Sequence, residues 1–364
     1  MMSELYIGIM SGTSLDGVDA VLAATHRGRM KFRASVHRPY AAGLRARLLA
    51  LHAPGPDELR RAAAIANELS TLYAAAACAL LAQARVRAGA VTAIGCHGQT
   101  VRHHPRFGYT AQLVNGAKLA ESTGISVVCD FRSRDIAAGG EGAPLVPAFH
   151  RAMFHTARHG RAIVNIGGIA NLTCLPARGP VTGFDCGPGG CLLDAWIRDR
   201  RRLPYDAQGA WAARGEVIPG LLARLLSHPF FRRKPPKSTG RDEYDLRWLK
   251  RALAGSEAPA DVQATLVELT ASVIARGIRS ACASASEVFV CGGGARNRTL
   301  LLRLAALLPG KRVASTATLG IDPAHVEALA FSWLARQAVK GRPGNLPGVT
   351  GARGPRVLGA IYPR

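Results

Sequence analysis

Two aspartates follow a run of glycine and hydroxyl residues near the start of the chain. The run is Ser11-Gly12-Thr13-Ser14, and Asp16, Gly17 and Asp19 come directly after it. Glycine lets a ligand approach the backbone closely, and successive N–H groups with nearby hydroxyls can surround phosphate oxygens. Carboxylate oxygens are ligands that Mg²⁺ prefers. We therefore expect a phosphate site here, with Asp16 and Asp19 as candidate Mg²⁺ ligands. A β-hairpin with a polar, solvated turn is the alternative.

Two later glycine turns also follow predicted strands. Gly167-Gly168 lies between two predicted strands and so repeats the arrangement of the first turn. Gly292-Gly293-Gly294 and Asn297 connect a strand predicted over 287–291 to a helix. Glycine at 292–294 would let a purine and a ribose lie against the backbone. Close packing of the strand on the helix would require glycine as well, so both interpretations stay open.

A single aspartate follows the strand that is predicted over 181–184. Asp185 precedes a glycine-rich turn and a helix through 192–196. A carboxylate at this position can cap the helix, or it can act as a general base in a cleft. The residue types alone do not choose between these roles.

Three further polar residues are candidates for contact with a ligand. Two of them follow a predicted strand, and the third lies in an apolar helix. His97 and Gln99 follow a predicted buried strand that ends at Gly95, and such strand ends carry ligand groups in α/β sheets. Glu327 lies in an otherwise apolar helix predicted over 321–335. We expect all three to contact a substrate, although a hydrogen-bonded structural histidine and an exposed glutamate are ordinary alternatives.

Composition limits the class of protein. The chain has 364 residues, 48% of them hydrophobic, which is enough for two domains with large cores. Its formal net charge is +23, but the basic residues are spread along the chain and only 6% of residues are aromatic. A base-stacking surface is therefore not expected, and we predict no nucleic-acid partner.

The cysteines and apolar runs indicate a cytoplasmic protein. None of the eight cysteines forms a C-x-x-C pair or a zinc-type cluster with histidine, and several lie in apolar runs. We interpret them as small buried residues of a reducing compartment. A strand and a turn begin almost at once, which leaves no room for a signal-peptide core, and no apolar run is expected to span a membrane.

Several longer strings resemble the 1,6-anhydro-N-acetylmuramic acid kinase family from end to end. The strings are GIMSGTSLDGVD at 8–19, GCHGQT at 95–100, DFRSRDIAAGGEGAPLVPAFH at 130–150, NIGGIANLT at 165–173, GFDCGPG at 183–189, KSTGR at 237–241, GGGARN at 292–297, HVEALAF at 325–331 and RPGNLPGVTGA at 342–352. The family is part of the superfamily of acetate and sugar kinases, heat-shock chaperones and actin-like ATPases.

This resemblance implies an α/β, two-domain actin-like ATPase (ribonuclease H-like) fold with a nucleotide cleft between the domains. The expected domains are 1–130 plus 345–364, and 131–344. It implies cofactors ATP and Mg²⁺, with phosphates held at the first turn and at Gly167-Gly168 and adenosine held at Gly292–Gly294. Asp185 would be the catalytic base. His97, Gln99 and Glu327 would bind the sugar.

The implied reaction opens the 1,6-anhydro bridge of 1,6-anhydro-N-acetylmuramic acid with water and phosphorylates O6. The products would be N-acetylmuramic acid 6-phosphate and ADP, in recycling of the cell wall and catabolism of amino sugars. The resemblance also suggests a cytoplasmic homodimer with no membrane partner.

Two residues depart from the family's DTGPGN string. Cys186 replaces threonine and Gly190 replaces asparagine, so the contacts made by those two side chains are in doubt.

Three rival functions follow from the same residues. They are a plain sugar kinase without ring opening, a chaperone-like or filament-forming ATPase, and a basic nucleic-acid-binding protein.

Overall fold

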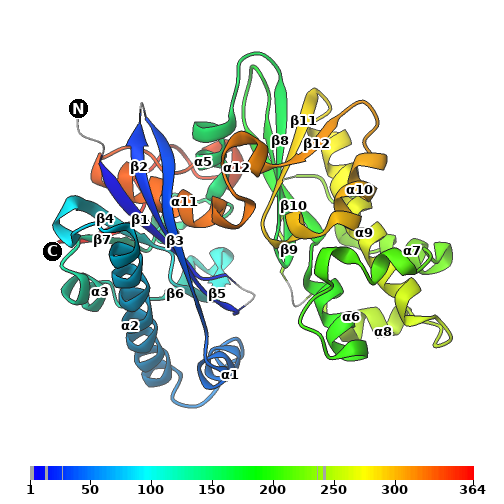
Figure 1. Cartoon of the computed structure of the whole chain (residues 1–364), viewed down its shortest axis with the longest axis horizontal. Helices are drawn as coiled ribbons and strands as arrows, with labels where there is room; N and C mark the ends of the chain where they lie inside the picture. Colours follow the sequence, from blue (N-terminus) through cyan, green and yellow to red (C-terminus); the bar gives the residue numbers. More distant parts are fainter. Residues whose placement is uncertain (1–3, 13–14, 27, 236, 241–242) are drawn as a thin grey trace. The chain divides into compact units, whose positions relative to one another are not determined.

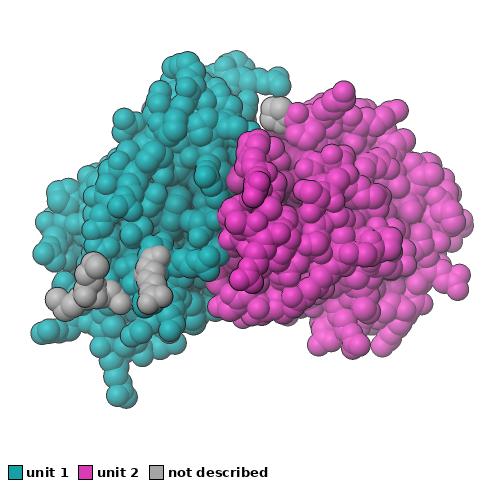
Figure 2. Space-filling model, turned by 90° about the horizontal axis from the view of Figure 1, so that it is seen from above, with its two compact units in different colours: residues 1–153, 325–364 teal, residues 154–324 magenta. Residues whose placement is uncertain are grey.

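The computed structural model describes residues 4–12, 15–26, 28–235, 237–240 and 243–364. It divides into two compact units, residues 1–153 with 325–364 and residues 154–324 (Figure 2). The sequence led us to expect divisions at 130/131 and 344/345. Residues 131–153 belong to unit 1, where Phe149 packs edge-to-face on Trp333 with ring centroids 6.3 Å apart.

Unit 1 is built on a six-stranded sheet in the order β13-β7-β4-β1-β2-β3 (Figure 1). Strands β1, β2 and β3 form an antiparallel meander, and β4 and β7 continue the sheet in parallel on the other side of β1. The strands are β1 Leu5–Met10, β2 Gly17–His26, β3 Arg29–Pro39, β4 Val91–Cys96, β7 Val127–Cys129 and β13 Ala360–Tyr362. A separate hairpin pairs β5 Gln99–His104 with β6 Tyr109–Leu113.

Two long helices pack on this sheet. Helix α2 Glu58–Ala84 lies against β2 and β3, and α11 Val326–Val339 lies against β1, β4 and β2. They cover opposite faces, because Ile7 and Ile9 join the core beneath α2, whereas Gly8 between them faces α11. The other helices of the unit are α1 Ala42–Ala50, α3 Gly116–Thr123, α4 Ser133–Ala137, α5 Val146–Phe154, whose last residue opens unit 2, and α12 Pro347–Thr350.

Unit 2 repeats the topology of unit 1. Its five-stranded sheet has the order β10-β9-β8-β11-β12, with an antiparallel meander of β8, β9 and β10 and parallel strands β11 and β12 (Figure 1). The strands are β8 Gly160–Ile166, β9 Ile169–Leu175, β10 Thr182–Pro188, β11 Ala285–Cys291 and β12 Arg312–Ser315. The helices are α6 Cys191–Arg201, α7 Pro219–Leu226, α8 Leu246–Ala252, α9 Pro259–Ala281 and α10 Arg298–Ala306.

Two predicted helix starts can be compared with the structure. Asp57 is the N-cap residue of α2, as the sequence predicts, although its backbone is left-handed and its side chain makes no capping hydrogen bond. Asp322 accepts from the N–H of Ala324 at 2.8 Å, so it caps a short 3₁₀ turn, and the helix proper begins later, at Val326.

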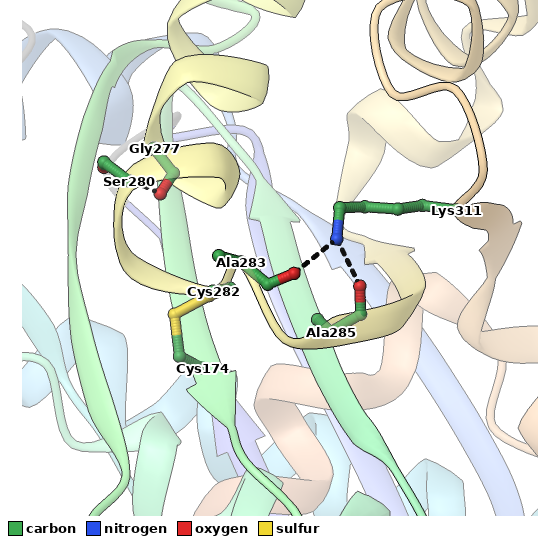
Figure 3. The surroundings of a disulfide bond; sticks show 7 residues. All are labelled: Cys174, Gly277, Ser280, Cys282, Ala283, Ala285 and Lys311. Atoms are coloured by element: carbon green, nitrogen blue, oxygen red, sulfur yellow. Dashed lines mark hydrogen bonds between the residues drawn. A yellow bond between two sulfur atoms is a disulfide. The ribbon is translucent and has the colours of Figure 1, made fainter.

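Two expectations about cysteines and apolar runs also need correction. Cys174 on β9 and Cys282 just after α9 form a disulfide, although their spacing gave no sign of it (Figure 3). Helix α2 is long and apolar enough by composition to cross a membrane, contrary to the expectation that no run is. Half of its apolar window is buried inside the unit, as in a core helix.

The contact of α11 with the sheet depends on glycines that bring two backbones together. A Cβ added at Gly95 would lie 2.1 Å from the carbonyl oxygen of Phe331. At Gly43 in α1, by contrast, nothing lies within 4 Å.

Gly95→Ala should therefore lower the free energy of unfolding by about 2–3 kcal/mol, because α11 must move away from β4. Gly43→Ala is the matched control and should raise it by about 0.5–1 kcal/mol, since alanine favours the helix. Urea denaturation of both variants measures the difference. Equal midpoints for the two variants would contradict this packing.

Candidate active site

The turn between β1 and β2 is held from behind by buried side chains. Ser11 is buried, and its Oγ lies 3.0 Å from the Tyr73 hydroxyl and 3.0 Å from the Gly98 carbonyl oxygen, to which it donates. The Ser11 hydroxyl, expected to face phosphate, is therefore directed into the unit. Thr13 and Ser14 lie outside the described residues.

Gln99 supports this turn. Its side chain is fully buried, its Nε2 donates to the Gly12 carbonyl at 3.2 Å, and its Oε1 accepts from the Tyr40 hydroxyl at 3.2 Å. Because both ends of the amide are used within the unit, Gln99 fixes the position of Gly12. This differs from the direct substrate contact that we expected from the sequence.

The two candidate Mg²⁺ ligands lie at the start of β2. Asp16 is exposed, and its carbonyl oxygen accepts from the Tyr40 N–H at 3.1 Å. Asp19 is half-exposed, and its Oδ1 lies 2.9 Å from His37 Nδ1. Gly17 between them is buried, and a Cβ there would lie 2.4 Å from the Arg38 carbonyl.

Among the described residues no group of three or more metal-binding side chains occurs. The carboxylates of Asp16 and Asp19 fit the usual ligand set of Mg²⁺, which is one or two carboxylates together with phosphate oxygens.

His97 and Arg132 form a buried pair next to Glu327. His97 Nε2 accepts from Arg132 Nη2 at 2.9 Å, and its ring packs on Phe331 of α11 with centroids 4.8 Å apart. Burial and the neighbouring guanidinium lower the pKa of His97 to about 3. At neutral pH the ring is therefore uncharged and carries its proton on Nδ1, because Nε2 is the acceptor.

Arg132 was not among the residues expected at the site. Burial lowers its pKa to about 10, and the carboxylates of Glu327 and Asp135 oppose that shift. Its Nη1 donates to the Gly142 carbonyl at 2.8 Å. A cation, a neutral histidine and a carboxylate therefore lie close together and can hold a polar ligand. The signal in the sequence was an arginine next to Asp130 and Phe131 at the end of a buried strand.

Asp135 fixes the segments around this group. Its Oδ1 accepts from Asn345 Nδ2 at 2.7 Å and from the Thr350 hydroxyl at 2.8 Å, and its Oδ2 accepts from the Gly142 N–H at 2.8 Å. The carboxylate is fully buried. It thus joins the glycine-rich loop after α4 to the C-terminal part of the chain, a connection that sequence spacing could not show.

In unit 2, Asp185 lies inside the edge strand β10 and not after its end as predicted. Its carboxylate accepts from Ser238 Oγ at 3.0 Å and from the Thr239 N–H at 3.0 Å, both through Oδ2. The Asn171 side-chain amide donates to Oδ1 from the neighbouring strand β9. Burial raises the pKa of Asp185, and these three hydrogen bonds oppose the rise. The N-cap residue of α6 is Gly190, so Asp185 does not cap this helix as one of the two interpretations expected.

The Gly167-Gly168 turn is bonded to the chain that follows Asp185. The N–H groups of Gly189 and Gly190 donate to the carbonyls of Gly168 and Gly167 at 2.9 and 2.8 Å. A Cβ at Gly189 would lie 2.4 Å from the Gly167 oxygen. The predicted phosphate turn and the predicted base are therefore positioned by one network.

The third glycine turn follows β11. Gly292 has φ of 76°, and a Cβ there would lie 2.4 Å from Asn165 Oδ1, so close packing alone requires glycine. Gly293 has nothing within 4 Å of an added Cβ, which leaves space beside it. Gly294 packs on Ile166. Asn297 accepts from the Leu300 N–H at 3.0 Å and so caps α10.

The two departures from the family string have separate environments. Cys186 is buried, and burial raises the pKa of its thiol to about 12, so the thiol stays protonated. A Cβ at Gly190 would meet its nearest atoms at 3.5 and 3.6 Å, which is ordinary contact. The backbone thus has room for the asparagine of the family string, and glycine is not imposed by packing.

The repeated sheet topology defines the class of the protein. The chain has the fold of the actin-like ATPases and sugar kinases. Its structure is similar to component A of (R)-2-hydroxyglutaryl-CoA dehydratase from Acidaminococcus fermentans, with a TM-score of 0.50, 12% sequence identity and coverage of 91% of this chain and 97% of that chain.

The sequence comparisons narrow this class to one family. The family model described as anhydro-N-acetylmuramic acid kinase matches residues 4–364. Proteins with that name from Nitrosospira multiformis and Variovorax paradoxus are each 54% identical to this chain, with 100% of both chains covered. The chain belongs to the anhydro-N-acetylmuramic acid kinase family.

The hydrogen bonds at Asp185 predict a shift in pH dependence. Ser238→Ala removes one donor that lowers the pKa of Asp185, so that pKa should rise. A general base must be ionised, hence the acidic limb of kcat/KM should move to higher pH. Ser227→Ala is the control, because Ser227 donates to the Arg224 carbonyl and not to Asp185. A limb that stays in place or moves to lower pH in Ser238→Ala would argue against Asp185 as the base.

Proposed function

We propose that this protein is an ATP-dependent kinase that opens 1,6-anhydro-N-acetylmuramic acid with water and phosphorylates O6. The products are N-acetylmuramic acid 6-phosphate and ADP, which places the enzyme in peptidoglycan recycling and amino-sugar catabolism. Membership of the family over the whole chain carries this proposal. The buried carboxylate of Asp185, held by three donors, is the proposed base.

Asp185 takes a proton from the water that attacks the anomeric carbon. Its raised pKa makes it a better proton acceptor than an ordinary aspartate, and the donors Asn171, Ser238 and Thr239 keep it aimed in one direction. The new C1–O bond forms as the C1–O6 bond breaks. O6 leaves with the bonding electron pair and becomes the nucleophile for the next bond.

The second bond forms between O6 and the γ-phosphorus of ATP, while the bond from that phosphorus to the β,γ-bridging oxygen breaks and ADP leaves. Phosphoryl transfer depends mainly on positioning and on neutralising charge, so backbone N–H groups matter more than side-chain chemistry. For the phosphates we propose the first turn, with Gly12, Thr13, Ser14 and Gly17, and the second turn at Gly167 and Gly168. For adenosine we propose Gly292–Gly294 and the segment that Asn297 caps.

Mg²⁺ would be held by Asp16 or Asp19 together with phosphate oxygens, and it would neutralise charge on the transferring phosphate. Asp16 is exposed, and Asp19 is partly exposed with its Oδ1 2.9 Å from His37 Nδ1, so both carboxylates stay candidate ligands.

For the sugar we propose His97, Glu327 and Arg132. The neutral His97 and the cation of Arg132 suit a ligand with both hydroxyl oxygens and a carboxylate. Gln99 does not contact the sugar in this proposal but positions Gly12 of the first turn. We further propose that the enzyme works in the cytoplasm as a homodimer, as the family resemblance suggests.

The reaction leaves a mass signature. Incubation of the protein with Mg-ATP and 1,6-anhydro-N-acetylmuramic acid should give a product that has gained one phosphate and one water, which mass spectrometry detects directly. In H₂¹⁸O the heavy oxygen should appear at C1. A product that gains phosphate without water would identify a plain sugar kinase. ADP formation without any change in the sugar would indicate an ATPase.

Asp185→Asn should lower kcat by at least about 10²-fold, because the amide cannot accept the proton from water. ATP affinity, measured by calorimetry, should stay within a few-fold of the wild type. Asp199→Asn is the matched control, because Asp199 is a partly exposed residue of α6, and it should leave kcat unaltered. Loss of ATP binding or of the folded state in Asp185→Asn would make Asp185 a structural residue instead.

A further inference from the structure

A cavity lies in unit 2 beside β10 and α9. Phe184 and Cys186 line it, and they flank Asp185 in the sequence where the pairing of β10 with β9 is irregular. Its other walls come from α9, through Val273 and Gly277, and from the segment before Ser238. The proposed reaction makes no use of this cavity.

The cavity combines an apolar floor with a basic rim. Five of its lining residues are cationic, and none of its described lining residues is acidic. The five are Arg232, Arg233, Lys234, Lys237 and Arg276. Like charges gathered around a concave surface repel one another, and a bound anion relieves that repulsion.

The charges on this rim are not neutralised by carboxylates among the described residues. Lys237 Nζ donates to the Phe230 carbonyl at 3.3 Å, and Arg232 Nη2 donates to the Ser227 carbonyl at 3.1 Å. None of the five cations forms an ion pair with a carboxylate in the part of the chain that the structure describes. Burial lowers the pKa of Lys237, and the charges of Arg276 and Arg233 add to the effect, whereas Cys186 and the carboxylate of Asp185 oppose it.

The apolar residues that line the cavity favour a ligand that carries an apolar group as well as an anion. Phe184, Phe231 and Val273 are buried residues that present apolar atoms to the cavity. At Gly277 an added Cβ would lie 3.1 Å from Cys186 Sγ, so α9 packs closely on β10 at this edge of the cavity. The volume is about 210 Å³. That exceeds the about 150 Å³ of a protein cavity that binds benzene, so a small ring has room.

We propose that this cavity is a binding site for a small phosphate monoester. Its apolar part rests on Phe184 and Phe231. Its phosphate lies among Lys234, Lys237 and Arg276. The ligand is distinct from the nucleotide and the sugar of the proposed reaction, and binding does not depend on turnover.

Calorimetry on the full chain tests this, with a saturating non-hydrolysable ATP analogue and Mg²⁺ present to fill the nucleotide site. Phenyl phosphate is the probe, and inorganic phosphate is titrated separately. Phenyl phosphate should bind at one site, at least tenfold more tightly than inorganic phosphate, because its ring buries apolar surface on the floor. No binding, or equal binding of the two probes, would overturn the proposal.

A double variant locates the site. Lys234→Gln with Arg276→Gln should weaken phenyl phosphate binding at least tenfold. Arg214→Gln with Arg251→Gln removes the same charge from exposed positions of unit 2 outside the cavity and should change binding less than twofold. An equal loss in both double variants would show attraction to net charge only and would overturn the site.

Chemical labelling gives an independent readout. The lowered pKa of Lys237 leaves more of its amine unprotonated, so acetic anhydride should modify it early. Phenyl phosphate should protect Lys237 and leave Lys250 and Lys311 reactive, as measured by peptide mass spectrometry. Unchanged labelling of Lys237 at saturating phenyl phosphate would place the ligand elsewhere and refute the assignment.

Discussion

The direct contact of α11 with the strand backbones of unit 1 is the constraint on which the rest of that unit depends. Gly8 and Gly95 carry no side chain, and a Cβ at either would lie about 2 Å from a carbonyl oxygen of α11. Because the helix lies so close, its first turn brings Glu327 toward Arg132, and Phe331 reaches the ring of His97. A packing requirement between backbones therefore places the polar residues proposed to hold the sugar.

In unit 2, burial and hydrogen bonding have opposite effects on the pKa of Asp185. Burial disfavours the charge on Asp185, whereas donors from Asn171, Ser238 and Thr239 favour it. Two of these donors come from a segment that runs beside the edge strand, since the Asp185 N–H donates to the Lys237 carbonyl at 3.1 Å. An edge strand has an unpaired side, and here that side is covered by residues that also tune the acid–base behaviour of the site.

The sequence allowed the glycine turns and their flanking strands to be predicted, because apolar runs interrupted by glycine are local signals. Roles that depend on tertiary contacts were harder to predict. Gln99 has the same neighbours in sequence whether it faces a ligand or the back of a turn, and only its burial decides. Arg132 and Asp135 act through partners far along the chain, as does the disulfide of Cys174 with Cys282. No periodicity encodes such contacts.

The hydrogen bonds of Asp135 with Asn345 and Thr350 also bear on how the protein is synthesised. They span 210 and 215 residues, and unit 2 occupies the sequence between them. During translation the continuous unit 2 can complete its core first, whereas unit 1 must wait for the last helix and strand to leave the ribosome. The first half of unit 1 thus stays exposed to chaperones and proteases for most of synthesis. Closing so long a loop also raises the contact order and slows folding.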